Sequence, residues 1–403
     1  MTKKRDTAPN QQVPIEDFTK ELIDSLNKEH GHRIAYNLSV DQSPTHVKRW
    51  ISTGSTLLDY CISNRRDGGL PEGRIVEIFG PPSIGKSHIA IQIAKSTQQL
   101  GGIVVYIDTE NATSVENLRL LGVDISKRFV YVDTHCTEEV FAIAEQTILK
   151  AKGMNRDVPI TIIWDSVAAS SPKAELDGDY DQQTIGLQAR TISKGMRKIT
   201  GVIGDQSVLF VCLNQVRMKV GYVLGDPSAP PGGMAIPFHA SVRIKLGAGQ
   251  HIKDANDESI GIHVSAKVIK NRVVAPFRSC NFQIHFGKGI FENDELFDAL
   301  RIYGAVTHEG HTIDIGGDGA YRRMIVTGPG GSLIIEKKFH KKDFTDVCLK
   351  DPTNRPWTLL ALDGALIKST LAPADVDIDP ESYTDIEAVA SMLGEDLTTT
   401  SPE

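Results

Sequence analysis

Cysteine is scarce in this sequence: there are 5 among 403 residues, and no two of them form a CxxC pair. A structural zinc site usually needs such close pairs of ligands, and a disulfide framework needs cysteines at a much higher density. The sequence therefore excludes a zinc-binding module and a disulfide-stabilised secreted domain. Scattered free thiols are typical of a reducing compartment, so we expect a cytoplasmic protein.

Long apolar runs are also missing. No stretch approaches the roughly 18 apolar residues that a membrane-spanning helix needs, and the chain does not open with a signal peptide. We therefore expect no contact with a membrane. A hydrophobic content of 40% with 24% charged residues is ordinary for a globular protein, and 403 residues exceed one typical domain.

Basic residues are absent beyond Lys368, whereas nine acidic residues follow it. Without this segment the chain contains 44 basic and 42 acidic residues, so the net charge of −7 arises from its end. We expect residues 369–403 to form an acidic, disordered tail. Two roles stay open: a solvated end, or a segment that competes with a polyanion for a basic groove.

The rest of the chain divides into three parts. We expect an N-terminal oligomerisation element over 1–49, because a helical apolar stripe over 16–30 and an alternating run over 33–39 have little core of their own. From 50 to 285, near-continuous apolar strands alternate with helices, which indicates an α/β core with a mostly parallel central sheet. Short glycine-rich runs then indicate a small α+β domain over 286–368. The expected core strands are 74–79, 103–108, 129–132, 160–165, 207–213, 241–247 and 263–271, and the expected helices are 87–99, 137–152 and 185–203.

A glycine-rich segment lies between the first of these strands and the first helix. It reads GPPSIGKS, a full match to the GxxxxGK[ST] pattern of phosphate-binding loops. The glycines let backbone N–H groups surround the phosphates of ATP, and the helix N-terminus adds positive potential. Lys86 would reach the β- and γ-phosphates, and the Ser87 hydroxyl would bind Mg²⁺. The expected ATP-binding residues are Gly80, Pro81, Pro82, Ser83, Ile84, Gly85, Lys86, Ser87 and His88.

Two carboxylates follow other apolar strands. Asp165 ends the strand ITIIWD and would hold the water shell of Mg²⁺, although a lone aspartate there is also typical of a cap. Glu110, in YIDTEN, would polarise the water that attacks the γ-phosphate, and the alternative is an acid in the first turn of a helix. Because the carboxyl ends of parallel strands share one crevice, we expect both side chains to face the phosphates.

A basic loop, LNQVRMKVGYVLGDPSAPPGG over 213–233, follows the buried run SVLFVC. It begins with the polar pair Asn214 and Gln215, continues with Arg217 and Lys219, and ends in Gly, Pro and Ser. Such a loop cannot fold by itself. We expect a nucleotide at its start and an acidic, extended partner along it.

In chain order, these motifs resemble those of RecA recombinases of bacterial or phage origin. The matching segments are ISTGSTLLDYCI, GGLPEGRIVEIFGPPSIGKS, YIDTENA, LGVD, WDSVAASSPKAEL, GLQARTISKGMRKI, LNQVRMKVG and KVIKNRVVAPF, collinear over about 50–290. The resemblance implies a RecA-like P-loop ATPase core and DNA-dependent ATP hydrolysis. It also implies a homo-oligomer, a helical filament on single-stranded DNA that pairs this strand with homologous double-stranded DNA during repair.

The resemblance further implies a set of residues around the γ-phosphate. Gln215 would sense this phosphate from the end of its strand. Lys270 and Arg272 would reach across the protomer interface to the neighbour's γ-phosphate, where cations stabilise transition-state charge. Together with Lys86 and Glu110, they form the expected catalytic set.

Two loops, over 175–186 and 216–233, would contact DNA, and DNA would give the second its order. Contacts from Lys and Arg to phosphates are independent of sequence and sensitive to salt, as a protein that accepts any sequence requires. Apolar wedges at Ile185 and Met218 would separate bases and leave their edges free. The expected DNA-binding residues are Ile185, Arg190, Ser193, Arg197, Arg217, Met218, Lys219, Val220, Gly232 and Gly233.

The chain departs from the family pattern at several positions. Ser114 and Asn117 stand where acidic and aromatic contacts to adenine are usual, and Arg272 replaces a lysine of different geometry. Two other functions stay open: a ring-forming motor or helicase with the same core fold, and a regulatory ATPase that does not bind DNA. The segment over 186–199 and the N-terminal element favour the filament.

Overall fold

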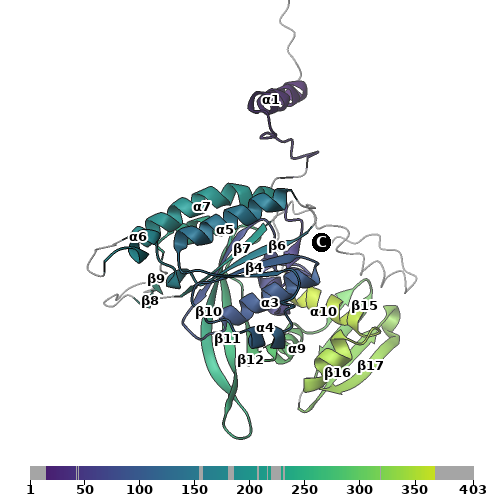
Figure 1. The fold of residues 1–403 in the computed structure, drawn as a ribbon. Helices are drawn as coiled ribbons and strands as arrows, with labels where there is room; N and C mark the ends of the chain where they lie inside the picture. The colour runs from purple at the N-terminus through teal and green to yellow at the C-terminus, as the bar shows by residue number, and fades with distance from the viewer. Residues whose placement is uncertain are drawn as a thin grey trace, which may run out of the picture. The chain divides into compact units, whose positions relative to one another are not determined.

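The computed structural model of this chain describes residues 15–41, 43, 45–153, 158–179, 186–206, 208–215, 217–218, 228–229, 232–317 and 319–367 (Figure 1). The described residues belong to two compact units, Met1–His46 and Val47–Glu403. The expected acidic tail over 369–403 lies outside the described residues.

The first unit contains helix α1 (Ile15–His30) and the loop that follows it. The Asn27 side chain accepts hydrogen bonds from the backbone N–H groups of Ile34 (2.7 Å) and Ala35 (2.9 Å), and it donates one to the Ala35 carbonyl (3.0 Å). These bonds occupy backbone groups that a strand partner would need. The strand that the alternating pattern predicts over 33–39 is therefore not formed, and this prediction was wrong.

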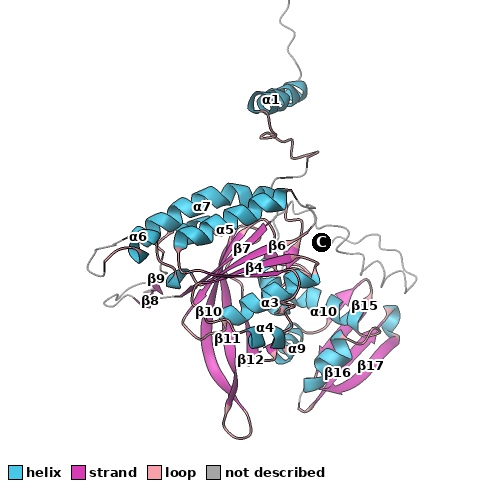
Figure 2. Ribbon diagram, in the orientation of Figure 1, coloured by secondary structure: helices cyan, strands magenta, loops and turns pink. Residues whose placement is uncertain are grey.

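The second unit is built around a nine-stranded sheet (Figure 2). Its order is β13 (Gly289–Phe291), β12 (Ser279–His285), β11 (Ser259–Asn271), β10 (Val242–Lys253), β3 (Ile75–Gly80), β7 (Val208–Gln215), β6 (Ile160–Asp165), β4 (Ile103–Asp108) and β5 (Phe129–Asp133). The strands from β10 to β5 are parallel, and β11 to β13 extend the sheet antiparallel. This arrangement confirms the predicted α/β class with a mostly parallel central sheet.

Helices cover both faces of the sheet, and each face has its own apolar core. Along β7, Leu209 and Val211 enter one core while Phe210 and Cys212 enter the other, because successive strand residues point to opposite faces. Figure 1 shows α5 and α7 side by side over one face, and α3 and α4 on the other side. The helices are α2 (Thr56–Ser63), α3 (Lys86–Gln99), α4 (Val115–Leu120), α5 (Thr137–Lys152), α6 (Lys173–Leu176), α7 (Leu187–Gln206) and α8 (Ala235–His239).

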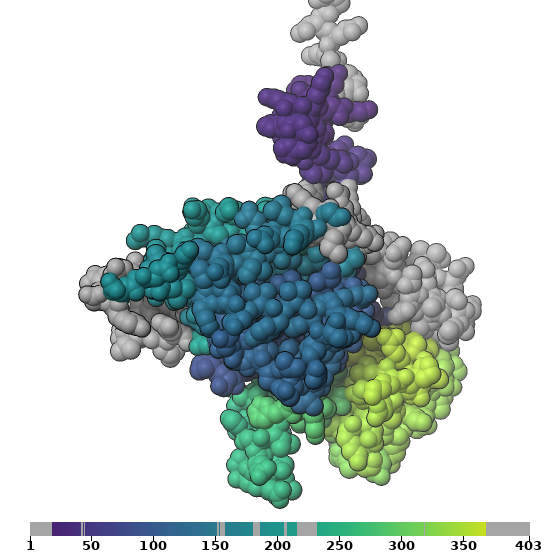
Figure 3. Space-filling model, in the orientation of Figure 1, coloured from purple at the N-terminus to yellow at the C-terminus, as the bar shows by residue number. Residues whose placement is uncertain are grey.

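A four-stranded antiparallel sheet and two helices follow the core and enclose a third apolar cluster. These elements are α9 (Asn293–Tyr303), β14 (Val306–His308), β15 (His311–Gly316), β16 (Tyr321–Thr327), β17 (Leu333–His340) and α10 (Arg355–Leu366). In the space-filling view this yellow-green part lies against the core, and the β10–β11 tip stands out beside it (Figure 3). The domain boundary near 285 stays a prediction.

Buried polar bonds join the core to the C-terminal sheet and its two helices. Asp363 of α10 accepts a hydrogen bond from the Tyr60 hydroxyl (2.6 Å) and pairs with Arg66. Glu292, 8% exposed, accepts bonds from the Ser55 hydroxyl (2.6 Å) and the Thr56 N–H (2.5 Å). The N-terminus of α2 is thus capped by a carboxylate that precedes α9.

The remaining strands form two short antiparallel pairs. They are β1 (Trp50–Ile51) with β2 (Leu70–Pro71), and β8 (Arg217–Met218) with β9 (Ser228–Ala229). No helix of the described residues is both long and apolar enough to cross a bilayer.

Candidate functional site

The carboxyl ends of β3, β7, β6 and β4 form one edge of the sheet. Gly80 at the end of β3 lies opposite Gln215 at the end of β7, and Asp108 of β4 lies opposite Asp165 of β6. Ligands of open α/β sheets bind outside this edge. The predicted phosphate loop, Gln215 and both carboxylate-bearing strands therefore meet there.

The phosphate loop between β3 and α3 depends on backbone conformations that favour glycine. Gly85, directly before α3, has a φ of 93°, and a Cβ at this position would lie 2.3 Å from Cδ1 of Ile284. A side chain would therefore be both strained and obstructed. Ser83 also has a positive φ, 55°. The chain turns tightly here and delivers the N-terminus of α3 to the edge of the sheet.

Lys86, the first residue of α3, folds back over the loop. Its ammonium donates to the carbonyls of Pro81 (2.6 Å) and Gly80 (3.2 Å). Burial lowers the pKa of Lys86, while the carboxylates of Asp165 and Glu110 oppose that shift. A cation held against loop carbonyls in this way can exchange them for phosphate oxygens.

Asp165 ends β6 and is 6% exposed. The Tyr106 hydroxyl donates to its Oδ2 (2.6 Å), and the Ser87 side chain lies beside the same carboxyl group. Burial raises the pKa of Asp165, whereas the hydroxyl groups of Tyr106 and Ser87 lower it. A hydroxyl beside a carboxylate offers the hard oxygen ligands that Mg²⁺ prefers, so Ser87 and Asp165 fit a magnesium ion with its water shell.

Glu110 lies just beyond β4 and is exposed. Its Oε1 accepts hydrogen bonds from Gln215 Nε2 (3.1 Å) and from the Ser166 hydroxyl. Its backbone N–H donates to Oδ1 of Asp108 (2.9 Å). The structure thus brings together Glu110 and Gln215, which are 105 positions apart in the chain. The Glu110 carboxylate therefore bonds to the end of β7, the strand that leads into the basic loop.

Lys270 and Arg272 lie at and just beyond the end of β11. The Lys270 ammonium donates to the carbonyls of Pro237 (2.8 Å) and Phe238 (2.9 Å), and Arg272 Nη2 donates to Phe238 (3.2 Å). Burial lowers the pKa of Lys270 to about 8, with repulsion from Arg272 as the next cause. Among the described residues, neither cation bonds to the phosphate loop of its own chain.

The expected DNA contacts with described side chains lie on or beside α7. Arg190 and Arg197 are exposed on this helix, and Ser193 between them is half-buried. The turn at Gly232 and Gly233 has φ values of 84° and 70°, and a Cβ on Gly232 would lie 2.7 Å from an isoleucine of α7. The end of the basic loop therefore packs against α7, the helix that carries the two arginines.

Five residues of the expected DNA-binding set have no described side chain. Ile185, Lys219 and Val220 fall outside the described residues. Arg217 and Met218 are described by their backbone, which forms β8 and pairs with β9. The loop that was expected to gain its order from DNA therefore contains a short antiparallel pair.

Sequence reasoning missed Tyr106 and Ser166, which hold the two key carboxylates. Tyr106 reads as one apolar residue of a buried strand, and the only signal is its hydroxyl two positions before the strand ends. Ser166 directly follows Asp165 in the sequence. Ser114 and Asn117 are the two residues that depart from the family's usual adenine contacts. Ser114 caps α4 by accepting a bond from the Asn117 N–H (3.0 Å).

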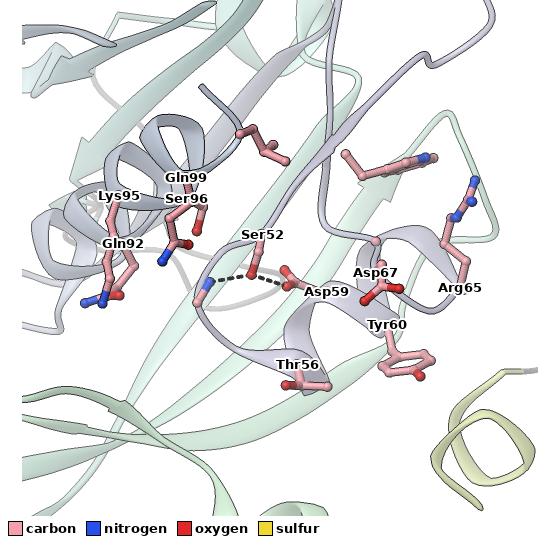
Figure 4. Close-up of a pocket in the computed structure, with 14 residues that line it drawn as sticks. Ser52, Thr56, Asp59, Tyr60, Arg65, Asp67, Gln92, Lys95, Ser96 and Gln99 are labelled. Atoms are coloured by element: carbon pink, nitrogen blue, oxygen red, sulfur yellow. Dashed lines mark hydrogen bonds between the residues drawn. The ribbon is translucent and has the colours of Figure 1, made fainter. Parts of the chain in front are cut away.

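A hollow of about 520 Å³ lies away from this edge, between α3 and the segments around β1 and α2 (Figure 4). Figure 4 shows side chains of α3 on one side and those of the 52–67 segment on the other. At its base, Asp59 accepts bonds from the Ser52 hydroxyl (2.5 Å) and the Thr53 N–H (2.8 Å), and burial raises its pKa to about 7. Residues 80–88 do not line this hollow, so it is separate from the phosphate site.

Comparison with known proteins identifies the family of the chain. The family model of the RecA N-terminal domain matches residues 18–291. The chain is similar to Protein RecA of Chlorobaculum tepidum, with 36% identity over 312 residues that cover 76% of this chain and 87% of the relative. It is also similar to Protein RecA of Wolinella succinogenes, with 41% identity covering 68% of this chain and 75% of the relative. Protein RecA of Geobacter sulfurreducens is 36% identical, covering 73% and 84%.

Proposed function

The chain belongs to the RecA family of recombinases, and from this premise we propose that it is an ATP-dependent recombinase acting on DNA. It would assemble as a helical filament on single-stranded DNA and exchange that strand with a homologous duplex during recombinational repair in the cytoplasm. The bond between Glu110 and Gln215 carries this proposal. It links the nucleotide site to the strand that enters the basic loop.

In this proposal, ATP binds at residues 80–88. Loop N–H groups and the N-terminus of α3 surround its phosphates, and Lys86 exchanges its bonds to Gly80 and Pro81 for phosphate oxygens. Ser87 and Asp165 would hold Mg²⁺, which neutralises charge on the phosphates when bound.

Glu110 would orient and polarise the attacking water. Its Oε1 is held by Ser166 and Gln215, which leaves Oε2 free of these two bonds. A carboxylate fixed in this way can accept a proton from water beside the γ-phosphate. Gln215 would exchange its bond to Glu110 for the γ-phosphate, so the end of β7 would respond to the state of the nucleotide.

Lys270 and Arg272 would complete the site of a neighbouring subunit. In one chain they hold the carboxyl-terminal carbonyls of α8, which directly follows the turn at Gly232. Reaching a neighbour's γ-phosphate would release α8 from these cations. Assembly, ATP and the second DNA loop would thus be coupled through one short helix. The exposed side chains of Phe18 and Leu22 on α1 (58% and 46%) suit the proposed oligomerisation element over 1–49.

DNA would bind along α7 and the two loops beside it. Arg190 and Arg197 would contact backbone phosphates, with Ser193 between them as a neutral donor. The loop residues Ile185, Arg217, Met218, Lys219 and Val220, with the turn at Gly232 and Gly233, would supply the remaining contacts. These contacts read no base edges, so affinity would depend on salt rather than on sequence.

A joint-molecule assay tests the proposed function. Single-stranded DNA coated with the protein is mixed with homologous or heterologous duplex, with and without ATP. We expect joint molecules only with homologous duplex and ATP. Joint molecules that form equally without ATP, or none under any condition, would contradict the proposal.

Electron microscopy separates the filament from the ring-forming motor that shares this core fold. The protein is incubated with single-stranded DNA and a slowly hydrolysed ATP analogue. Helical filaments are expected, whereas closed rings without filaments would favour the motor. ATP turnover that DNA fails to raise would favour a regulatory ATPase instead.

A further inference from the structure

Tyr106 is a tyrosine in the middle of the sheet whose hydroxyl contacts a charged group. Its side chain in β4 is fully buried, with an exposed fraction of 0%. The hydroxyl donates to Oδ2 of Asp165 at 2.6 Å, a length typical of an O–H donor to a carboxylate. Buried carboxylates need such donors, because water no longer solvates them.

The hydrogen bond from Tyr106 fixes the orientation of the Asp165 carboxyl group relative to the phosphate loop. Asp165 is 6% exposed, and Ser87, the residue that fits Mg²⁺, lies beside its carboxyl group. With Oδ2 held from the sheet side by Tyr106, the carboxyl group cannot rotate about its Cβ–Cγ bond without losing that donor. A ligand held in one orientation loses less entropy when it binds a metal or its water shell.

Tyr106 also lies near the turn that holds Glu110. Its hydroxyl lies beside the Thr113 side chain. Thr113 in turn donates its backbone N–H to Oδ2 of Asp108 (3.0 Å), and Oδ1 of Asp108 accepts the Glu110 N–H (2.9 Å). The Tyr106 hydroxyl therefore lies beside the turn that carries Glu110.

The ring of Tyr106 has a separate task. It stacks on Phe129 of the neighbouring strand β5, with ring centroids 6.2 Å apart and planes inclined by 29°. A phenylalanine would preserve this stack and the burial. The hydroxyl alone makes the polar bonds, so the two contributions can be separated by removing one atom.

We propose that Tyr106 is a positioning residue for the magnesium–nucleotide site, because its hydroxyl holds the Asp165 carboxyl group in the orientation that faces Ser87. This inference rests on the proposed function, since it requires that Asp165 act on Mg²⁺. The hydroxyl does not touch the nucleotide. Its loss should change the requirement for Mg²⁺ and leave Mg²⁺-independent binding of the nucleotide intact.

The test compares the full-length protein with Tyr106→Phe, Asp165→Asn and Tyr60→Phe. Tyr60→Phe is the matched control: Tyr60 is 3% exposed and donates to Asp363 at the same distance, 2.6 Å, outside the phosphate site. The measurement is the binding of a fluorescent ATP analogue, titrated with Mg²⁺ and repeated with a chelator. Binding is read directly, so the result does not depend on hydrolysis.

We expect Tyr106→Phe to raise the half-saturating Mg²⁺ concentration about tenfold, the lower range for losing a partner of a metal ligand. Asp165→Asn should raise it at least as much, and Tyr60→Phe should leave it unchanged. Binding in chelator should be equal in wild type and Tyr106→Phe. In an Asp165→Asn background, Tyr106→Phe should add little, because the group that it positions is gone.

Several results would overturn the inference. If Asp165→Asn raises the Mg²⁺ requirement and Tyr106→Phe does not, Asp165 keeps its proposed function and the positioning by Tyr106 is refuted. If Tyr60→Phe shifts the requirement as much as Tyr106→Phe, the effect is a general loss of stability. If Asp165→Asn itself has no effect, the proposed magnesium site fails, and the inference fails with it.

Discussion

Glu110 shows how much a single residue depends on partners distant in sequence. Its position after a strand predicts that it faces the crevice, but position alone favours an N-cap or an acid in the first turn of a helix. Its partners settle the geometry: Gln215 and Ser166 both donate to the same oxygen. Neither partner could be assigned to Glu110 from spacing alone, because they follow other strands.

Glu110→Gln should bind ATP and form filaments on DNA but hydrolyse ATP slowly. The amide keeps an oxygen that can accept the bonds from Gln215 and Ser166, yet it is too weak a base to accept a proton from water. We expect turnover to fall about 10²- to 10⁴-fold, the range for losing a general base. A phosphate-release assay with single-stranded DNA measures it.

Glu116→Gln is the matched control for this change. Glu116 is an exposed acid of α4 in the same segment. Its turnover should equal that of the wild type. Normal turnover of Glu110→Gln would remove Glu110 from the reaction.

At the scale of elements, short polar joints decide how helices attach to strands. α8 is held at its carboxyl-terminal end by Lys270 of β11 and by Arg272 just beyond that strand, and α10 is held to α2 through Asp363. Both joints link segments far apart in sequence. Apolar packing alone sets the direction of a helix only weakly. These charge-assisted bonds add the geometric specificity that orients α8 and α10.

The cation Lys270 should make assembly dependent on pH. Its pKa is lowered to about 8, so it loses its charge as pH rises through that value rather than near 10.5, and Arg272 keeps its charge throughout. We expect DNA-stimulated ATP hydrolysis to decline as pH rises from about 7 to about 9. Lys270→Arg should flatten this decline, because a guanidinium stays protonated. Identical pH profiles of the two proteins would exclude Lys270 as the source.

The joint between α10 and α2 should contribute to stability. The Asp363 side chain is 16% exposed and lies between the Tyr60 hydroxyl and the Arg66 guanidinium, which is 7% exposed. Asp363→Ala leaves both donors without this carboxylate, and we expect the free energy of unfolding to fall by about 2–3 kcal/mol. Urea denaturation followed by circular dichroism measures it.

The control for this joint is Asp346→Ala. Asp346 pairs with Lys350 at 2.8 Å on the surface, where both side chains are about 70% exposed. Exposed pairs of this spacing contribute about 0.3–0.5 kcal/mol. Equal losses in Asp363→Ala and Asp346→Ala would show that the joint is no stronger than a surface pair.

At the scale of the whole molecule, charge is divided between a near-neutral body and an acidic end. The nine acidic residues beyond Lys368 account for the net charge of −7. They follow α10, the last described helix, which is joined to the core. Through its charge, this segment can repel DNA from any basic surface within its reach.

A chain truncated after Lys368 should therefore load faster onto duplex DNA. Loss of nine negative charges reduces repulsion of the phosphates, and the gain should shrink as salt shortens the Debye length to about 10 Å at 0.1 M. Loading can be timed by the onset of duplex-dependent ATP hydrolysis at two salt concentrations. Unchanged loading at low salt would leave the acidic end as a solubilising segment.

The sequence by itself determined the fold class, and it predicted residues that the structure gathers at one edge of the sheet. Buried strands read as apolar runs because both faces of a parallel sheet are covered, and the phosphate loop reads as GPPSIGKS because glycine is needed at Gly85. These are local requirements, so they leave a local pattern. The helix over 137–152 matches α5 for the same reason.

Only the tertiary structure decided which side chains meet. Tyr106 looked like a core residue and holds Asp165, while Lys270 was expected to reach a neighbouring subunit and holds α8 in its own chain. The prediction of a strand over 33–39 was wrong. Asn27 bonds to backbone N–H groups that a strand would use for pairing, and an alternating pattern of side chains does not reveal this. Contacts between distant strands depend on sheet order and register, and a single sequence contains neither.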